Sequence, residues 1–308
     1  TAKWLPVKAL KYPLKSDPAR PMERLTMKYI PQLLAALSML VSAAAAHPTP
    51  EDNADAVAHY LANEGVMVVS GETKILFDPL FNWDVRGLYQ LVPEDMRAAM
   101  MAGQPPYDGI DAVFVSHAHD DHFAAADMNS YLTAHPEVVL FAPAQAVEAM
   151  REAEGWQPGF EGATPRIFSF AMDYGDPAET PKALIGVDVE AIRIPHAGGP
   201  ARLGIQNMVF RVTLEEGATV MHLGDAQPDR ALFSPHDEFL AARRTHMAFV
   251  PDWFFAALGG DATREMLNAI KAVGVHVQVV VPEGLKASGE DYFSVPGETR
   301  VITIGKDD

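Results

Sequence analysis

The order of hydrophobic and polar positions predicts alternating strands and helices from about residue 57 onward. Short β-branched runs are typical of strands, and longer stretches with apolar residues every three or four positions are typical of helices. The expected strands are 65–70 and 73–77, joined as a hairpin, and then 111–116, 138–141, 187–194, 208–214, 218–223, 247–250 and 276–281. The expected helices are 93–101, 144–154, 229–242 and 262–273. This alternation favours a layered α/β fold.

Three of the predicted strands end at side chains that could bind a ligand. The strand 111–116 runs into His117-Ala118-His119-Asp120-Asp121-His122, the strand 187–194 delivers Pro195-His196, and the strand 218–223 delivers Gly224-Asp225. Loops at the carboxyl ends of strands often gather side chains into one site. We therefore expect a functional site at these strand ends.

The N-terminal region carries a targeting signal. Met27-Lys28 precedes an apolar stretch from Leu33 to Ala46, in which Ala44 and Ala46 are spaced as in a small-residue cleavage site. The stretch has about 14 apolar residues, which is short for a membrane span. We interpret it as a signal peptide; the alternative, an apolar helix of the folded domain, stays open.

These features divide the chain into three parts. Residues 1–26 are expected to be a non-native or disordered extension, residues 27–46 the signal peptide, and residues 47–308 a single catalytic domain. An exported protein, periplasmic or secreted, without a stable membrane anchor is the resulting expectation.

Composition narrows the chemistry. The chain has 308 residues, 48% of them hydrophobic, which is enough for a full core. Its formal net charge of −17 makes nucleic acid a poor candidate partner, so we expect a small-molecule substrate. The absence of cysteine excludes disulfides, thiolate metal ligands and a cysteine nucleophile. Any metal must therefore be held by His, Asp or Glu.

The histidine cluster has the spacing of a metal site. His117 and His119 lie two positions apart just after a strand, so both imidazoles can point to one side, and Asp121 and His122 can face a neighbouring position. Neutral imidazole and carboxylate suit zinc, and also iron or manganese. One or two Zn²⁺ ions are the expected cofactors.

A strand followed by His-x-His-x-Asp-His, then a distant histidine and a distant Gly-Asp, resembles the metallo-β-lactamase superfamily over roughly residues 57–304. The resemblance implies a four-layer αββα sandwich with mixed β-sheets. It implies two metal positions with a shared carboxylate, the first held by His117, His119 and His196 and the second by Asp121, His122 and the bridging Asp225. It also implies that Asp78, in Leu76-Phe77-Asp78-Pro79, supports the metal loop from behind.

One departure from the family pattern concerns the second metal. The superfamily usually supplies a last histidine after a late Val/Ile-rich strand and a proline, but Val279-Val280-Val281-Pro282-Glu283 contains none. Glu283 is a candidate oxygen ligand there, and a carboxylate on a surface turn is the simpler interpretation. His222 shares a strand face with Gly224, so we expect a structural or supporting role for it. The remaining histidines are expected to be solvated or packed: His47, His59, His135, His236, His246 and His276.

These observations predict a metal-dependent hydrolase that uses a metal-activated hydroxide on a small ester, lactone or amide such as a β-lactam. Asp121 is the expected catalytic carboxylate, which orients the hydroxide and carries a proton to the leaving group. Arg202 or Lys286 could recognise a phosphate or carboxylate, and the aromatic run Pro251–Phe255 could form a pocket wall or simply core. Rival functions are a small-molecule phosphodiesterase, a di-iron oxygenase-type enzyme, and a metal-binding protein with a degenerate second position and no catalysis.

Overall fold

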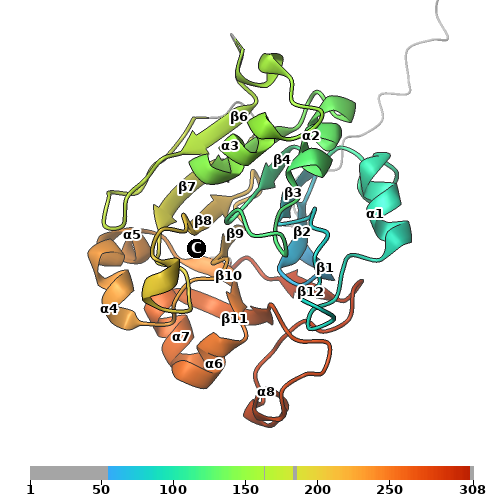
Figure 1. Cartoon of the computed structure of the whole chain (residues 1–308). Helices are drawn as coiled ribbons and strands as arrows, with labels where there is room; N and C mark the ends of the chain where they lie inside the picture. The colour runs from blue at the N-terminus through green and yellow to red at the C-terminus, as the bar shows by residue number, and fades with distance from the viewer. Residues whose placement is uncertain (1–54, 163, 183–185, 306–308) are drawn as a thin grey trace, which may run out of the picture. The chain divides into compact units, whose positions relative to one another are not determined.

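The computed structural model describes residues 55–162, 164–182 and 186–305, shown in Figure 1. The predicted extension 1–26 and signal peptide 27–46 lie outside the described residues. Among the residues that are described, no helix is both long and apolar enough to span a membrane.

The first sheet has seven strands, one of which leads directly into the histidine loop. Its order is β12 (Thr299–Ile302), β1 (Ala56–Ala62), β2 (Gly65–Ser70), β3 (Thr73–Phe77), β4 (Ala112–Phe114), β5 (Val139–Pro143) and β6 (Ile167–Phe170). Pairs from β12 to β3 are antiparallel, and pairs from β3 to β6 are parallel. The hairpin predicted for 65–77 is confirmed, with Ser70 paired to Thr73.

The second sheet has five strands in the order β11 (Ala269–Val275), β10 (Thr245–Pro251), β9 (Thr219–His222), β8 (Met208–Thr213) and β7 (Asp188–Arg193). The pairs β7–β8 and β8–β9 are antiparallel, whereas β9–β10 and β10–β11 are parallel. Both sheets are therefore mixed, as the sequence predicted.

Side chains along each strand point alternately to the two faces of its sheet, and the apolar ones form three buried layers. Ile75 and Phe77 of β3 face inward and pack in one cluster with Phe210 and Phe249 of the second sheet. Leu76, between them, faces the opposite side. Because successive strand residues point to opposite faces, each strand contributes to the core between the sheets and to a core beneath the helices.

Helices cover the outer face of each sheet. The first sheet packs against α1 (Glu94–Met101), α2 (Ala125–Ala134) and α3 (Ala144–Glu152). The second packs against α4 (Arg230–Phe233), α5 (Asp237–Ala242), α6 (Trp253–Ala257), α7 (Gly260–Leu267) and α8 (Glu283–Ser288). Figure 1 shows the two sheets with these helices on opposite sides. The predicted four-layer αββα sandwich is confirmed.

The sequence-based prediction is wrong near the last strand of the second sheet. The predicted helix 262–273 ends at Leu267, where Asn268 adopts a left-handed conformation that terminates α7. The next seven residues form β11, which pairs in parallel with β10. The strand expected at 276–281 is absent; Val279 and Val280 are exposed instead. The true strand therefore ends just before His276.

Candidate metal centre

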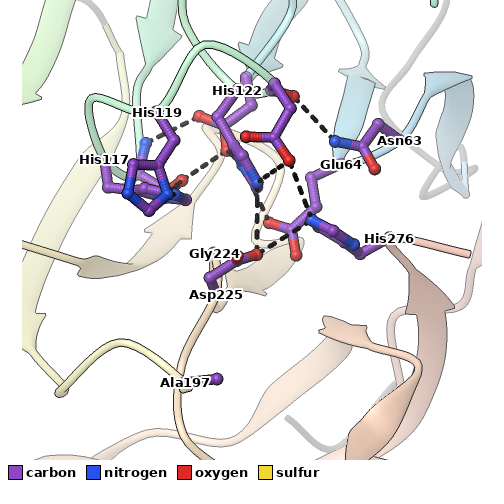
Figure 2. A network of polar contacts seen from close by, with 12 residues as sticks. Asn63, Glu64, His117, His119, His122, Ala197, Gly224, Asp225 and His276 are labelled. Atoms are coloured by element: carbon purple, nitrogen blue, oxygen red, sulfur yellow. Dashed lines mark hydrogen bonds and ion pairs between the residues drawn. The ribbon is translucent and has the colours of Figure 1, made fainter. Parts of the chain in front are cut away.

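Four strand ends, drawn from both sheets, converge on one cluster of imidazoles and carboxylates. The loop after β4 carries His117, His119, Asp121 and His122, while the ends of β7, β9 and β11 bring the other ligands. A β-bridge between His196 and Ala226, and a hydrogen bond from Ala197 N to Asp225 O of 2.7 Å, join the ends of β7 and β9. The structure thus brings together all six residues that the sequence predicted as metal ligands. Figure 2 shows four of them, His117, His119, His122 and Asp225.

The first ligand set consists of His117, His119, His196 and Asp225. His117 Nε2 and His196 Nε2 lie 3.0 and 3.1 Å from His119 Nδ1, and His196 Nε2 lies 3.2 Å from Asp225 Oδ2. Ligands about 2 Å from a tetrahedral metal lie about 3.3 Å from each other, which is close to these separations. The donor set and its spacing fit a transition metal ion.

The second ligand set consists of Asp121, His122 and His276, again beside Asp225. His122 Nε2 and His276 Nε2 each lie 3.3 Å from Asp225 Oδ1, and His276 Nε2 lies 3.6 Å from Asp121 Oδ2. Figure 2 shows both rings directed at Asp225. The two oxygens of Asp225 thus face different sets, as expected of a bridging carboxylate.

The inward-facing atoms of the second set support metal binding. His122 Nε2, His276 Nε2 and Asp225 Oδ1 are buried and have no hydrogen-bond partner among the described residues. A buried polar atom without a partner costs about 1–3 kcal/mol, so three of them converging on one point need a common partner. A divalent cation satisfies all three at once.

His276 is the residue that sequence reasoning missed. The sequence predicts a solvated or packed side chain here, because it shows no partner for His276. In the structure it follows β11 directly, is 3% exposed, and adopts a positive φ of 57° that points its ring at the cluster. It supplies the late histidine that the family pattern requires.

Glu283, the proposed substitute, lies elsewhere. It begins α8, its side chain is 88% exposed, and it pairs with Lys286 at 2.6 Å. Of the two interpretations of Glu283, the surface carboxylate agrees with this position, and the candidate role as an oxygen ligand does not. Because Lys286 is engaged in this surface pair, it does not reach the metal centre either.

Asp78 holds the metal loop from behind, as the resemblance implied. Its Oδ1 accepts a hydrogen bond from Ser116 N at 2.7 Å, and its Oδ2 accepts from Ser116 Oγ at 2.5 Å and lies 3.0 Å from His122 Nδ1. A carboxylate on the far nitrogen fixes the ring so that the other nitrogen faces the metal. Asp78 thus orients His122 without entering either ligand set.

Gly224 places Asp225. Its φ is +50°, and a Cβ there would lie 2.5 Å from Ser116 Cβ and 2.5 Å from Asn207 Oδ1. Asn207 Oδ1 in turn accepts a hydrogen bond from Asp225 N at 2.9 Å. Only glycine permits this close approach, which presses the end of β9 against the metal loop.

A second buried carboxylate, Glu64, lies behind the cluster and had no sequence signal. His222 Nε2 donates to Glu64 O at 2.9 Å, which gives His222 the supporting position expected for it. Both carboxylate oxygens of Glu64 lack a hydrogen-bond partner among the described residues, and Oε2 lies 3.8 Å from His122 Nδ1. Burial raises the pKa of Glu64 well above its usual range.

The pKa values of the candidate ligands are shifted in different directions. Burial holds the pKa of His117 well below its usual value, which keeps the ring neutral and able to bind a metal. Burial also opposes protonation of His122, but Asp225 and the other carboxylates outweigh it and raise that pKa. For Asp121, burial favours the neutral form, yet His276 and His122 outweigh it and lower the pKa.

The cluster opens into a pocket of about 610 Å³. Besides ligands from both sets, the lining includes the aromatic residues Trp83, Tyr89 and Trp253 and the cation Arg202. The aromatic run 251–255 therefore contributes to both of its predicted roles, since Trp253 lines the pocket whereas Phe254 and Phe255 lie in the helical core.

An αββα sandwich with two histidine and carboxylate sets at its strand ends is typical of metal-dependent hydrolases. A family described as beta-lactamase superfamily domain matches residues 73–281, more than half of the chain. The protein therefore belongs to the metallo-β-lactamase superfamily, as its motifs predicted. No curated protein matches it significantly.

Solved structures of low sequence identity share the fold. A possible metal-dependent hydrolase from Veillonella parvula has a TM-score of 0.53 and 15% identity, covering 80% of this chain and 99% of its own. A metallo hydrolase from Ignicoccus hospitalis has a TM-score of 0.50 and 15% identity, covering 81% and 99%. An isothiocyanate hydrolase from Delia radicum gut bacteria has a TM-score of 0.50 and 16% identity, covering 79% and 98%.

Proposed function

We propose that the protein is a zinc-dependent hydrolase of a small ester, lactone or amide such as a β-lactam. The observation that carries the proposal is the pair of ligand sets that share Asp225 and open into one pocket. His117, His119 and His196 would hold one ion and Asp121, His122 and His276 the other. The all-nitrogen-and-oxygen donor set suits zinc, and iron and manganese are the competing metals.

When bound, such ions lower the pKa of a coordinated water and polarise the oxygen of the bond under attack. The chain supplies the rest of the chemistry. Asp121 lines the pocket beside both Asp225 and His276, so its carboxylate can accept a hydrogen bond from the attacking water. After the tetrahedral species forms, the same carboxylate can pass a proton to the leaving group.

The completed second set favours catalysis over a degenerate metal-binding role. A degenerate second position would lack a late histidine, whereas His276 lies within reach of Asp121 and His122 and would take that place. A small phosphodiester remains the second candidate, because Arg202 in the pocket lining suits an anionic substrate.

Metal analysis tests the proposal most directly. The protein purified without chelator should contain about two equivalents of zinc, and His119→Ala and Asp225→Ala should each contain less while remaining folded by circular dichroism. His59→Ala, a histidine outside both sets, is the matched control and should keep the full content. Wild-type protein should hydrolyse members of a panel of nitrophenyl esters, lactones and β-lactams, and both ligand variants should lose this activity. Wild-type metal content near zero, or unchanged turnover in either variant, would refute the proposal.

A further inference from the structure

Arg202 is held at the pocket wall by the backbone next to a metal ligand. It ends the short 3₁₀ turn Pro200–Arg202, which follows His196-Ala197-Gly198-Gly199. A Cβ on Gly198 would lie 2.9 Å from Arg202 Cδ and 3.1 Å from Nε, so the arginine stem packs directly on that glycine. The absence of a side chain at Gly198 thus leaves room for the arginine stem, and Arg202 lines the same pocket as His119 and His196.

The guanidinium of Arg202 has no hydrogen-bond or ion-pair partner among the described residues. Several other arginines of the described chain are paired, for example Arg97 with Asp127 at 2.6 Å and Arg211 with Glu190 at 2.8 Å. Arg202 is also the only Lys or Arg among the described residues that line the pocket. Arg202 is exposed and lines the pocket of a chain with a net charge of −17, so its guanidinium donors are free to bind an anionic group that enters.

Another part of the pocket lining is aromatic. The rings of Tyr89 and Trp253 pack against the His276 ring, with centroid distances of 4.1 and 5.1 Å. Trp253 is fixed by a hydrogen bond from its Nε1 to Ala226 O at 3.1 Å. Trp83, also in the lining, is 45% exposed, which leaves much of its side chain available for contact. The second ligand set is therefore bordered by an apolar wall, and the first by a cation.

We propose that the substrate is an amphiphilic anion, with an oxyanion group that binds Arg202 and a flat apolar group that packs on the wall formed by Trp83, Tyr89 and Trp253. This inference rests on the proposed function and deepens it. The planar guanidinium donates two parallel hydrogen bonds to a carboxylate or a phosphate-type group, which a neutral substrate cannot accept with the same strength. The scissile bond would lie between the two groups, above the ligand sets.

Calorimetric titration of the metal-loaded protein tests binding without turnover. The probes are phenylacetate, phenylphosphonate and the neutral phenylacetamide. Arg202→Ala should weaken phenylacetate binding about 10-fold while leaving phenylacetamide unchanged. The phenylacetate affinity of Arg202→Lys should lie between those of wild type and Arg202→Ala, because lysine keeps the charge but loses the two parallel donors of the guanidinium. Trp83→Ala should instead weaken all three probes by a similar factor of about 3- to 10-fold.

The comparison of probes separates the possible outcomes. A larger loss for phenylphosphonate than for phenylacetate in Arg202→Ala assigns a phosphate-type group, and the reverse assigns a carboxylate; either supports the proposal. Equal losses for the acid and the amide, no loss at all, or no binding of either anion to the wild type would overturn it. Charge-dependent binding without hydrolysis of any substrate would support this inference and contradict the proposed function.

Discussion

Replacement of Gly224 by alanine should destabilise the fold through a contact that can be quantified. The residue has a φ of +50°, a conformation that costs an L-residue about 1–2 kcal/mol. The new Cβ would also lie 2.5 Å from Ser116 Cβ and from Asn207 Oδ1, and overpacking of this kind costs about 1–3 kcal/mol. The free energy of unfolding should therefore fall by about 2–5 kcal/mol.

Gly217 provides a matched control. It has a φ of +92°, but a Cβ there would meet nothing within 4 Å. Gly217→Ala should therefore cost only the conformational part, about 1–2 kcal/mol. Both substitutions reduce the conformational freedom of the unfolded chain equally, so that contribution cancels in the comparison.

Urea unfolding followed by circular dichroism, with chelator present, measures both variants without a contribution from bound metal. The metal content of Gly224→Ala, measured separately, should also fall, because the added methyl group displaces Asp225. Equal destabilisation of the two variants would refute the close-approach argument. Full metal content in Gly224→Ala would refute the role of the glycine in placing Asp225.

Three further predictions address other parts of the chain. His276→Ala should bind about one zinc equivalent fewer than wild type by elemental analysis, and an unchanged content would exclude His276 as a ligand. Without metal, Glu64→Gln should unfold at a higher urea concentration than wild type, and this difference should grow as the pH rises above about 4.5. Burial raises the pKa of Glu64 in the folded state, so its ionised form destabilises the fold progressively with pH. A difference that does not change with pH would contradict this. Export of the full chain in a bacterial host should yield a mature N-terminus at His47, and a retained Leu33 to Ala46 segment on N-terminal sequencing would contradict the signal peptide.

Local patterns were sufficient to predict most of the fold. The hairpin of β2 and β3 and the strand before His117 carry period-two or wholly apolar runs with clear turn residues, and the structure has them within a few residues. Motif order was sufficient to predict the six candidate ligands that the structure gathers, because each follows a strand whose end could be recognised.

The errors have a common physical cause. The segment 268–275 is a short apolar run after a helix, and such a run fits a helix or a buried strand equally well. Its strand form is decided by parallel pairing with β10, a contact between distant residues. A helix predicted through residue 273 leaves His276 away from the end of a strand, and the next polar residue after an apolar run is then Glu283. The sequence gives no signal for Glu64 for a similar reason, since its contacts are with distant residues such as His222, which lies 158 residues away.

The composition of the two ligand sets has a consequence for the lifetime of the protein. Each set joins the loop after β4, in the first sheet, to residues at the strand ends of the second sheet. An ion bound in either set would therefore act as a cross-link between the two halves of the sandwich. Free metal at 100 times the dissociation constant would add about 2.7 kcal/mol to folding stability, which is about a hundredfold fewer unfolded molecules. Susceptibility to proteolysis should then follow the supply of metal around the protein as closely as its activity does.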